Sequence, residues 1–417
     1  MKKVLLGTTA LIAGGLAAVP AMAADPIKIG VGGYMQQYFN AGHYGGTGVG
    51  ATATDYRTPN YKYEGEIWFI GQTKLDNGTT VGVRFELEGW SQSGVNPGVN
   101  GGTPSLSQDT MDEEYIFAFG DWGRIDFGGK DVASYVMFYG APNALPGYGA
   151  TQFNFGAGSA SISGANGALH QNAWSAGVLG VDANRLTYYT PRFFGLQFGV
   201  SYTPQFNTVS QAGAGGAGVF NAQPNAAAAC GFNGGAGNAP LCNSGQNAYV
   251  NGISLSVNYV NKFGDLGIAA SFGWDHAAYD AGIVNSGLQA TYNALAGGLN
   301  ISYAGFTVGG SFGWDNNGLI SGNANLFWSA GIMYETGPWA ASFTYFGGSR
   351  RENVAALAGT GGAVGTDQIH LFMLGGTYAI GPGIKLVGGF YYEAASGQNQ
   401  SERTDSWQFL IGTELRF

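Results

Sequence analysis

Beyond residue 23 the sequence lacks any apolar run as long as the one at its N-terminus. An α-helix needs about 20 apolar residues to cross a bilayer. The only other spanning structure that satisfies every backbone N–H and C=O internally is a closed β-barrel. If this chain resides in a membrane, it must therefore cross with strands.

Charge is also scarce, at 10% of residues, and acids outnumber bases by 26 to 17. The formal net charge is −9, and it becomes −11 if Lys2 and Lys3 leave with a cleaved N-terminal segment. This acidic balance argues against nucleic acid as a partner. By contrast, 74 glycines and 14% aromatic residues suit short strands with tight turns and rings at membrane boundaries.

Cysteine and histidine are few. Cys230 and Cys242 lie close together in a Gly/Ala/Asn-rich stretch, which in an exported chain predicts a disulfide. The four histidines are scattered, so no metal site is predicted from them. The acidic group Asp109, Asp112, Glu113 and Glu114 could offer oxygens to a divalent cation, but a solvated loop leading into a strand is the favoured interpretation.

No catalytic constellation is present. The run from Gly213 to Gly218 fits G-x-G-x-x-G, yet it lies in a low-complexity stretch without the strand and helix that a dinucleotide site needs. We therefore predict neither an enzyme activity nor a cofactor.

The N-terminal 23 residues have the layout of a secretory signal. Lys2 and Lys3 precede an apolar stretch over 4–19, and Ala21-Met-Ala23 forms a small-x-small cleavage site. We predict cleavage after Ala23 and a single mature domain over 24–417.

Strict alternation of apolar and polar residues recurs along that domain. In 79–88, Val83 and Phe85 alternate with Arg84 and Glu86, and Asn77-Gly78 supplies the preceding tight turn. The same pattern predicts sixteen strands, at 27–40, 64–75, 79–88, 113–119, 124–130, 184–190, 196–204, 249–261, 266–275, 291–303, 306–315, 325–335, 339–348, 367–380, 384–395 and 405–417. Short turns and long connections alternate between them, so we predict an antiparallel transmembrane barrel with short periplasmic turns and long extracellular loops.

Several segments resemble a known family. The Leu75-Asp-Asn-Gly78 turn, the hairpin from Asp112 to Arg124, the segment from Asn184 to Pro191 and the terminal Phe417 are similar to those of Gram-negative general diffusion porins, particularly of alphaproteobacterial type. The resemblance covers essentially the whole mature chain. It implies an outer-membrane homotrimer whose third long loop folds into the lumen, and a C-terminal Phe417 that the barrel-assembly machinery recognises.

Charged side chains on the strands should face the lumen, because an arginine or lysine at mid-membrane costs about 2–4 kcal/mol. The constriction loop is expected to begin at Asp131, to include Tyr135, Phe138 and Tyr139, and to end at Asp182. Between its two aspartates it has no Asp, Glu, Lys or Arg, unlike the acidic inward loop usual in the family. The predicted pore-lining residues are Glu66, Arg84, Glu86, Glu114, Arg124, Asp126 and Lys130.

These features together predict a passive outer-membrane channel for small hydrophilic solutes and ions, with a modest preference for cations and with membrane lipid around it. Two alternatives stay open. The loop aromatics would suit a channel selective for a sugar or another specific solute, and the long connection over 205–248 would suit an adhesive or structural barrel.

Overall fold

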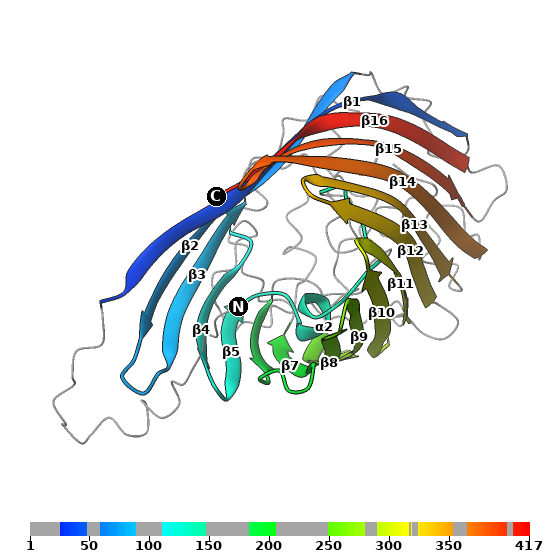
Figure 1. Ribbon diagram of the computed structural model, residues 1–417. Helices are drawn as coiled ribbons and strands as arrows, with labels where there is room; N and C mark the ends of the chain where they lie inside the picture. Colours follow the sequence, from blue (N-terminus) through cyan, green and yellow to red (C-terminus); the bar gives the residue numbers. More distant parts are fainter. Residues whose placement is uncertain are drawn as a thin grey trace, which may run out of the picture.

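The computed structural model describes residues 26–47, 59–88, 111–146, 183–205, 249–279, 290–316, 318, 324–352, 365–397 and 403–417. Within them, sixteen antiparallel strands form a closed barrel with a short helix, α2, inside it (Figure 1). None of the helices in these residues is long and apolar enough to cross a membrane. The bounds are β1 Lys28–Thr47, β2 Asn60–Lys74, β3 Thr80–Glu88, β4 Glu114–Gly120, β5 Gly123–Gly129, α2 Ala133–Val136, β6 Asn184–Tyr189, β7 Leu196–Gln205, β8 Tyr249–Phe263, β9 Leu266–Tyr279, β10 Tyr292–Tyr303, β11 Phe306–Asp315, β12 Ala324–Thr336, β13 Trp339–Glu352, β14 Gly365–Gly381, β15 Ile384–Ser396 and β16 Arg403–Arg416.

The barrel closes between its first and last strands. β1 pairs with β16 from Tyr34 opposite Arg416 to Thr47 opposite Arg403. Beyond β16, Phe417 exchanges both backbone hydrogen bonds with Gly33, each 3.0 Å long. Closure leaves no unpaired strand edge, as a structure surrounded by lipid requires.

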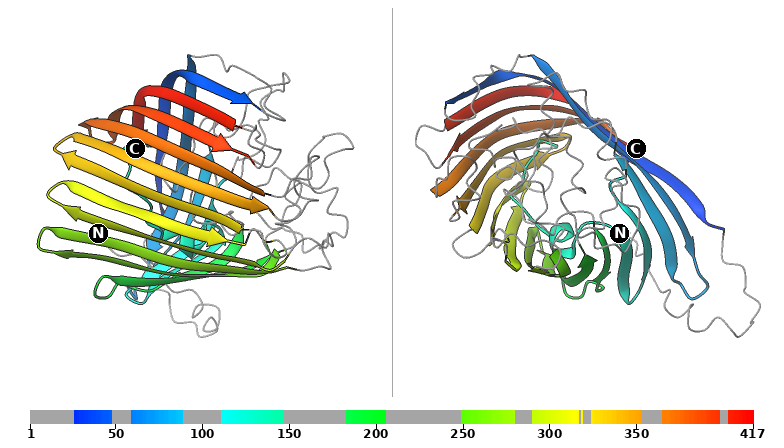
Figure 2. Two further views of the ribbon diagram at one scale, coloured as in Figure 1. Left: turned by 90° about the vertical axis from the view of Figure 1, so that its right-hand side faces the viewer. Right: turned by 180° about the vertical axis from the view of Figure 1, so that it is seen from behind.

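Short hairpin turns gather at one end of the tilted strands (Figure 2). At the turn between β10 and β11, Ala304 and Gly305 both have positive φ, 50° and 84°. Positive φ at both central residues is the hairpin geometry that matches the right-handed twist of the strands. The predicted turn at Asn77-Gly78 is also present, where Gly78 has φ 83°.

Side chains alternate between an inner and an outer face. The inner face is identified at Ser201 on β7, whose hydroxyl accepts a hydrogen bond from the backbone N–H of Ala133 on the internal helix. Directly paired residues share a face, so the pairs Ser201–Thr187, Thr187–Asp126 and Asp126–Phe117 place the same face inward on β6, β5 and β4. The outer face carries large exposed apolar side chains, among them Phe272, Phe312, Leu374, Phe409 and Ile411.

The predicted fold is confirmed, with differences at strand ends. β1 extends to Thr47 and β2 begins at Asn60, so the first long connection is shorter than the stretch 41–63 between the two predicted strands. β9 and β13 each run four residues beyond their predicted ends, to Tyr279 and Glu352. Helix α2 was not predicted.

Candidate functional site

A chain segment with a single charged residue, Asp131, crosses the inside of the barrel. After β5, residues 131–146 pass through α2, which contacts β6 to β9 (Figure 1). The segment continues along the inner wall and reaches β1, where the Tyr38 hydroxyl donates to the Pro146 carbonyl at 2.8 Å. This is the inward loop that the sequence predicts, and we call residues 131–146 the inner segment.

Serine hydroxyls from five strands, β7, β8, β9, β12 and β13, hold the inner segment. Each accepts a hydrogen bond from a backbone N–H, which otherwise would be buried without a partner. A net hydrogen bond contributes about 0.5–1.5 kcal/mol, so the set stabilises this path by several kcal/mol. The pairs are Ala133 N with Ser201 (2.9 Å), Ser134 N with Ser254 (3.1 Å), Tyr139 N with Ser271 (2.9 Å), Ala141 N with Ser329 (3.2 Å) and Ala144 N with Ser342 (2.9 Å).

Glycines on the same inner wall, on β9, β10, β14 and β15, leave room for the segment. A Cβ at Gly298 would overlap the carbonyl oxygen of Tyr139, and one at Gly273 would lie 2.8 Å from the Ser134 side chain. Gly375 and Gly389 give similar space to Leu145, with Cβ distances of 2.6 and 2.7 Å to its side chain. The serines and glycines together form a track, which we call the glycine-serine track.

A buried carboxylate fixes the helix of the inner segment. The Ser134 hydroxyl lies 2.8 and 2.9 Å from the two carboxylate oxygens of Asp275 on β9, and both residues are buried. Arg185 on β6 is only 2% exposed and acts electrostatically on both Asp275 and Asp131. Burial, with the nearby Glu113 carboxylate, raises the pKa of the Asp131 carboxyl well above its ordinary range.

The predicted constriction residues take different positions. Tyr135 packs partly buried against an inner-wall cluster, and the Tyr139 backbone lies on the glycine-serine track. Phe138 is buried among apolar inner-wall side chains, so its ring does not line the pore. Val136, which we did not predict, is 48% exposed. Asp182 lies outside the described residues.

The opposite wall carries charge. On β3, Arg84 forms a salt bridge with Glu86 and lies 4.8 Å from the Trp68 ring centroid. On β5, Asp126 is 2.6 Å from Arg124 and 3.4 Å from Lys130. Burial alone would lower the pKa of Lys130, but the carboxylates of Glu113 and Asp126 outweigh it and raise that pKa. By pairing, Arg84, Glu86, Arg124 and Asp126 share the inward face, and Lys130 directly follows β5.

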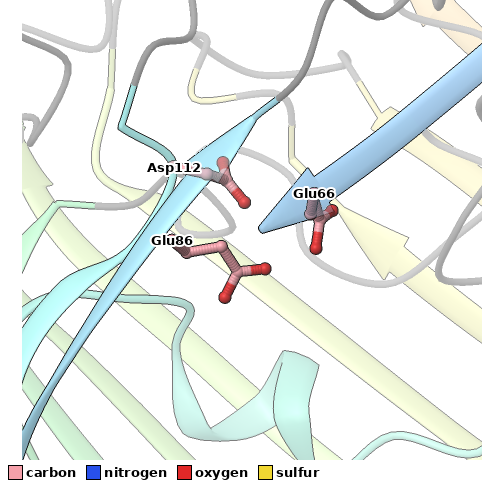
Figure 3. A group of neighbouring side chains, drawn as sticks. All are labelled: Glu66, Glu86 and Asp112. Carbon is pink, nitrogen blue, oxygen red and sulfur yellow. The ribbon is translucent and has the colours of Figure 1, made fainter. Parts of the chain in front are cut away.

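Three carboxylates converge on this wall. Oxygens of Glu66 on β2, Glu86 on β3 and Asp112 lie within 4.8 Å of one another (Figure 3). Glu66 accepts hydrogen bonds from the Tyr34 hydroxyl at 2.7 Å and the Trp68 indole N–H at 3.0 Å. The three side chains offer the oxygen ligands that hard cations prefer. We call them the acidic trio.

The prediction that Glu114 lines the pore is wrong. Glu114 pairs with Phe85, which is 42% exposed on the outer face, whereas its neighbour Tyr115 pairs with Arg84 inside. The acidic run therefore does not converge on one site: Asp112 joins the acidic trio, and Glu113 approaches Arg84 at 3.8 Å. Asp109 lies outside the described residues.

Two further charged groups were missed. Arg185 is inward on β6, and the rule that charges avoid lipid would have placed it there from its alternation with Leu186 and Tyr188. On β16, Glu414 bridges Lys385 at 3.3 Å and Arg416 at 3.1 Å. The alternation of polar and apolar residues near the end of the chain would have predicted that Glu414 and Arg416 face inward.

The remaining predicted residues concern assembly and oxidation. Phe417 is 71% exposed at the seam between β1 and β16. Cys230 and Cys242 lie outside the described residues, so their disulfide stays a prediction.

Residues 7–398 match the Gram-negative porin family, so the chain belongs to that family. Its members are channels of the outer membrane and not enzymes, and this protein is accordingly an outer-membrane porin for passive diffusion. The short turns are then periplasmic and the long connections extracellular. No curated protein sequence matches the chain.

Solved structures share the fold at low identity. The outer membrane channel DcaP of Acinetobacter baumannii has a TM-score of 0.57 at 9% identity, over 96% of this chain and 100% of that one. The trimer form of OmpT from Vibrio cholerae gives 0.54 at 11%, over 94% and 100%. An anion-selective porin from Comamonas acidovorans gives 0.53 at 13%, over 94% and 100%.

Proposed function

We propose that this porin passes small hydrophilic solutes and ions with a modest preference for cations. The observation that carries the proposal is the environment of Glu66. Its hydrogen-bond donors Tyr34 and Trp68 are uncharged side chains, so these two contacts add no positive charge beside the Glu66 carboxyl. Glu86 and Asp112 add carboxylates within 4.8 Å. A net negative field in a narrow aqueous pore favours cations.

The bases on this wall are offset by acids. Arg84 pairs with Glu86, Arg124 with Asp126, and Lys385 and Arg416 with Glu414. The exposed groups of these pairs are the bases: the Arg416 and Lys385 side chains are 47% and 46% exposed, whereas Glu414 is 2% exposed. This arrangement limits the cation preference, because a passing ion meets the basic member of each pair first.

The route for solutes runs along the charged wall. Inner-face residues beneath the inner segment are buried, as Ser201, Ser254 and Thr344 illustrate at 1%, 1% and 0% exposure. Residues 132–146 carry no charge, so this part of the inner segment narrows the lumen without adding a field. Selectivity then depends on β1 to β5 and β16.

The reversal potential of single channels in a KCl gradient tests this proposal. We expect the potassium permeability to exceed the chloride permeability modestly at 0.1 M salt and less so at 1 M, because the Debye length falls from about 10 Å to about 3 Å. An anion-selective wild type would show that the acidic trio does not set the field.

The barrel is proposed to assemble as a homotrimer through the outer face of β4 to β6. β4 and β5 have seven residues and β6 has six. A tilted seven-residue strand rises about 18 Å, less than the apolar band of about 25 Å that such barrels present to lipid. A second copy would cover this low wall and the outward Glu114, which is unfavourable in lipid.

Disulfide cross-linking tests the trimer contact. Ile116 lies on the outer face of β4 with 52% of its side chain exposed, and Ile116→Cys is the test variant. Ile301 on β10 is 43% exposed, and Ile301→Cys is the matched control. Oxidation should link neighbouring copies through position 116 and not through 301. Equal linking at both positions would contradict the proposed contact.

Two finer assignments complete the proposal. The Leu75-Asp-Asn-Gly78 turn and the segment from Asn184 to Pro191 support the alphaproteobacterial type. Cleavage after Ala23 would leave Ala24 as the first mature residue, which N-terminal sequencing of the exported protein would establish.

A further inference from the structure

A row of rings crosses the outer face of five neighbouring strands. The pairing register aligns Tyr345 on β13 with Phe372 on β14, Tyr392 on β15, Trp407 on β16 and His43 on β1. The Tyr345 and Phe372 ring centroids are 5.0 Å apart, and those of Phe372 and Tyr392 are 6.3 Å apart. Rings of this kind mark the boundary of the apolar band in outer-membrane barrels.

The outer face changes character at this row. On its periplasmic side lie exposed apolar side chains, such as Leu374 at 53% and Phe409 at 57%. On its extracellular side the face is polar. The residues there are His370 and Asp405 in one paired row, Gln368 and Arg403 in the next, and Arg351 beyond them, and we call these five residues the polar band.

The height of the polar band agrees with this change. His370 lies eleven positions before Gly381 at the periplasmic turn of β14. A tilted strand rises about 2.5 Å per residue, so His370 stands about 25 Å or slightly more above the turn. That equals the height of the apolar band, and the polar band is therefore level with the lipid headgroups.

Hydrogen bonds give His370 a defined orientation. The Trp328 indole N–H donates to the Tyr345 oxygen at 3.2 Å, and that hydroxyl is 2.8 Å from His370 Nδ1. Because an indole N–H only donates, the Tyr345 proton is available for Nδ1 of a neutral imidazole. In the tautomer that accepts the Tyr345 proton at Nδ1, Nε2 carries the imidazole proton and can act as an N–H donor.

We propose that the polar band binds the phosphate of an outer-leaflet lipid. Arg351 and Arg403 are both exposed, and they outnumber the single acid of the band, Asp405. Arginine and imidazole N–H groups suit phosphate oxygens. The apolar face directly below, including Leu374 and Phe409, suits the acyl chains of the same molecule, which favours a lipid over free phosphate.

Lipid association at the barrel surface tests the proposal. The purified porin is placed in phosphatidylcholine vesicles with a trace of spin-labelled phosphatidylglycerol or spin-labelled phosphatidylcholine, and the relative association of the two labels is measured. R351Q/R403Q should lower the preference for phosphatidylglycerol about fivefold for each charge removed at low salt. K262Q removes a charge near the periplasmic turn of β8 and is the matched control.

Variants of His370 and His276, which lie at similar heights on the barrel, distinguish hydrogen bonding by the imidazole from packing of its ring. H370F should reduce the phosphatidylglycerol preference further, whereas H276F on β9 should not, because no arginine lies above His276 on the described part of that strand. Unchanged single-channel conductance confirms that each variant is folded. The proposal is overturned if R351Q/R403Q behaves like wild type, if K262Q loses as much, or if excess inorganic phosphate displaces the labelled lipid.

Discussion

The inner faces of β7 to β15 carry a chain segment, whereas those of β1 to β5 face the solute route, and their residues differ accordingly. The first wall presents serine and glycine, such as Ser271, Gly273 and Gly298, so that a backbone can lie directly on it. The second presents long charged side chains over aromatic rings, such as Arg124 at 5.2 Å from the Phe117 centroid. We call the inner faces of β7 to β15, which hold the inner segment, the seating wall, and those of β1 to β5, which face the solute route, the charged wall.

The difference separates pore size from pore charge. On the seating wall, specificity comes from close approach and hydrogen bonds to backbone N–H groups, which tolerate no added side-chain volume. On the charged wall, the field comes from acids and bases that can be exchanged without filling space. Substitutions on the first wall should therefore change conductance, and those on the second should change ion preference.

Removal of Phe417 should have the largest effect, because both walls depend on the seam between β16 and β1. The deletion removes two backbone hydrogen bonds to Gly33 and the exposed terminal ring. We expect little folded barrel in the outer membrane, measured by heat-modifiable mobility of membrane fractions. Phe417→Tyr, which keeps a terminal ring, should assemble. Undiminished folded barrel in the deletion variant would refute the assembly role.

Gly298→Val should have the next largest effect, confined to the seating wall. Its Cβ would overlap the Tyr139 carbonyl oxygen, so the inner segment must move away from β10. Overpacking of this kind costs about 1–3 kcal/mol. We expect an altered single-channel conductance with an unchanged reversal potential.

Gly376→Val is the control for this substitution. It lies on a strand of the same barrel, and a Cβ there meets only ordinary contacts at 3.7 Å or more. It should leave the conductance unchanged. If Gly298→Val shifted the reversal potential instead of the conductance, the division between the two walls would not hold.

Strand positions could be predicted from sequence because alternation and Gly-containing turns act locally. The faces of β4 could not. Its inner side is aromatic, with Tyr115 and Phe117 under Arg124 of β5, and its outer side begins with Glu114. Cation–ring contacts thus reverse the usual polarity rule, and a seven-residue strand gives too few alternations to reveal the reversal.

The path of the inner segment also could not be predicted from the sequence. Its composition predicted a neutral loop, but the serines that hold it lie on five strands. The most distant of them, Ser342, is 198 positions from Ala144, the residue whose N–H it accepts. The burial of Phe138 depends on the same long-range contacts. Only the closed barrel brings the track together.

On the charged wall, R84Q/R124Q should increase the cation preference. Arg84 and Arg124 offset Glu86 and Asp126, so their loss makes the net charge of this wall more negative by two, with Lys130 still beside Asp126. We expect a shifted reversal potential at 0.1 M salt, a smaller shift at 1 M, and little change in conductance. R351Q/R403Q, which removes the same two charges from the outer face, is the control. A double variant with an unmoved reversal potential would assign the field to other residues.

The cysteine pair should have the smallest effect, because it belongs to neither wall. Cys230 and Cys242 lie in the connection between β7 and β8 and are expected to form a disulfide. Chain entropy gives about 3 kcal/mol for a closed loop of about fifteen residues, here acting on the order of that connection and not on barrel pairing. Alkylation and mass spectrometry without reductant should find no free thiol, and a reduced sample should be labelled twice. Two labelled cysteines before reduction would exclude the bond. Reduction should leave the conductance and the reversal potential as they were, since the serine contacts and the salt bridges that set them are untouched.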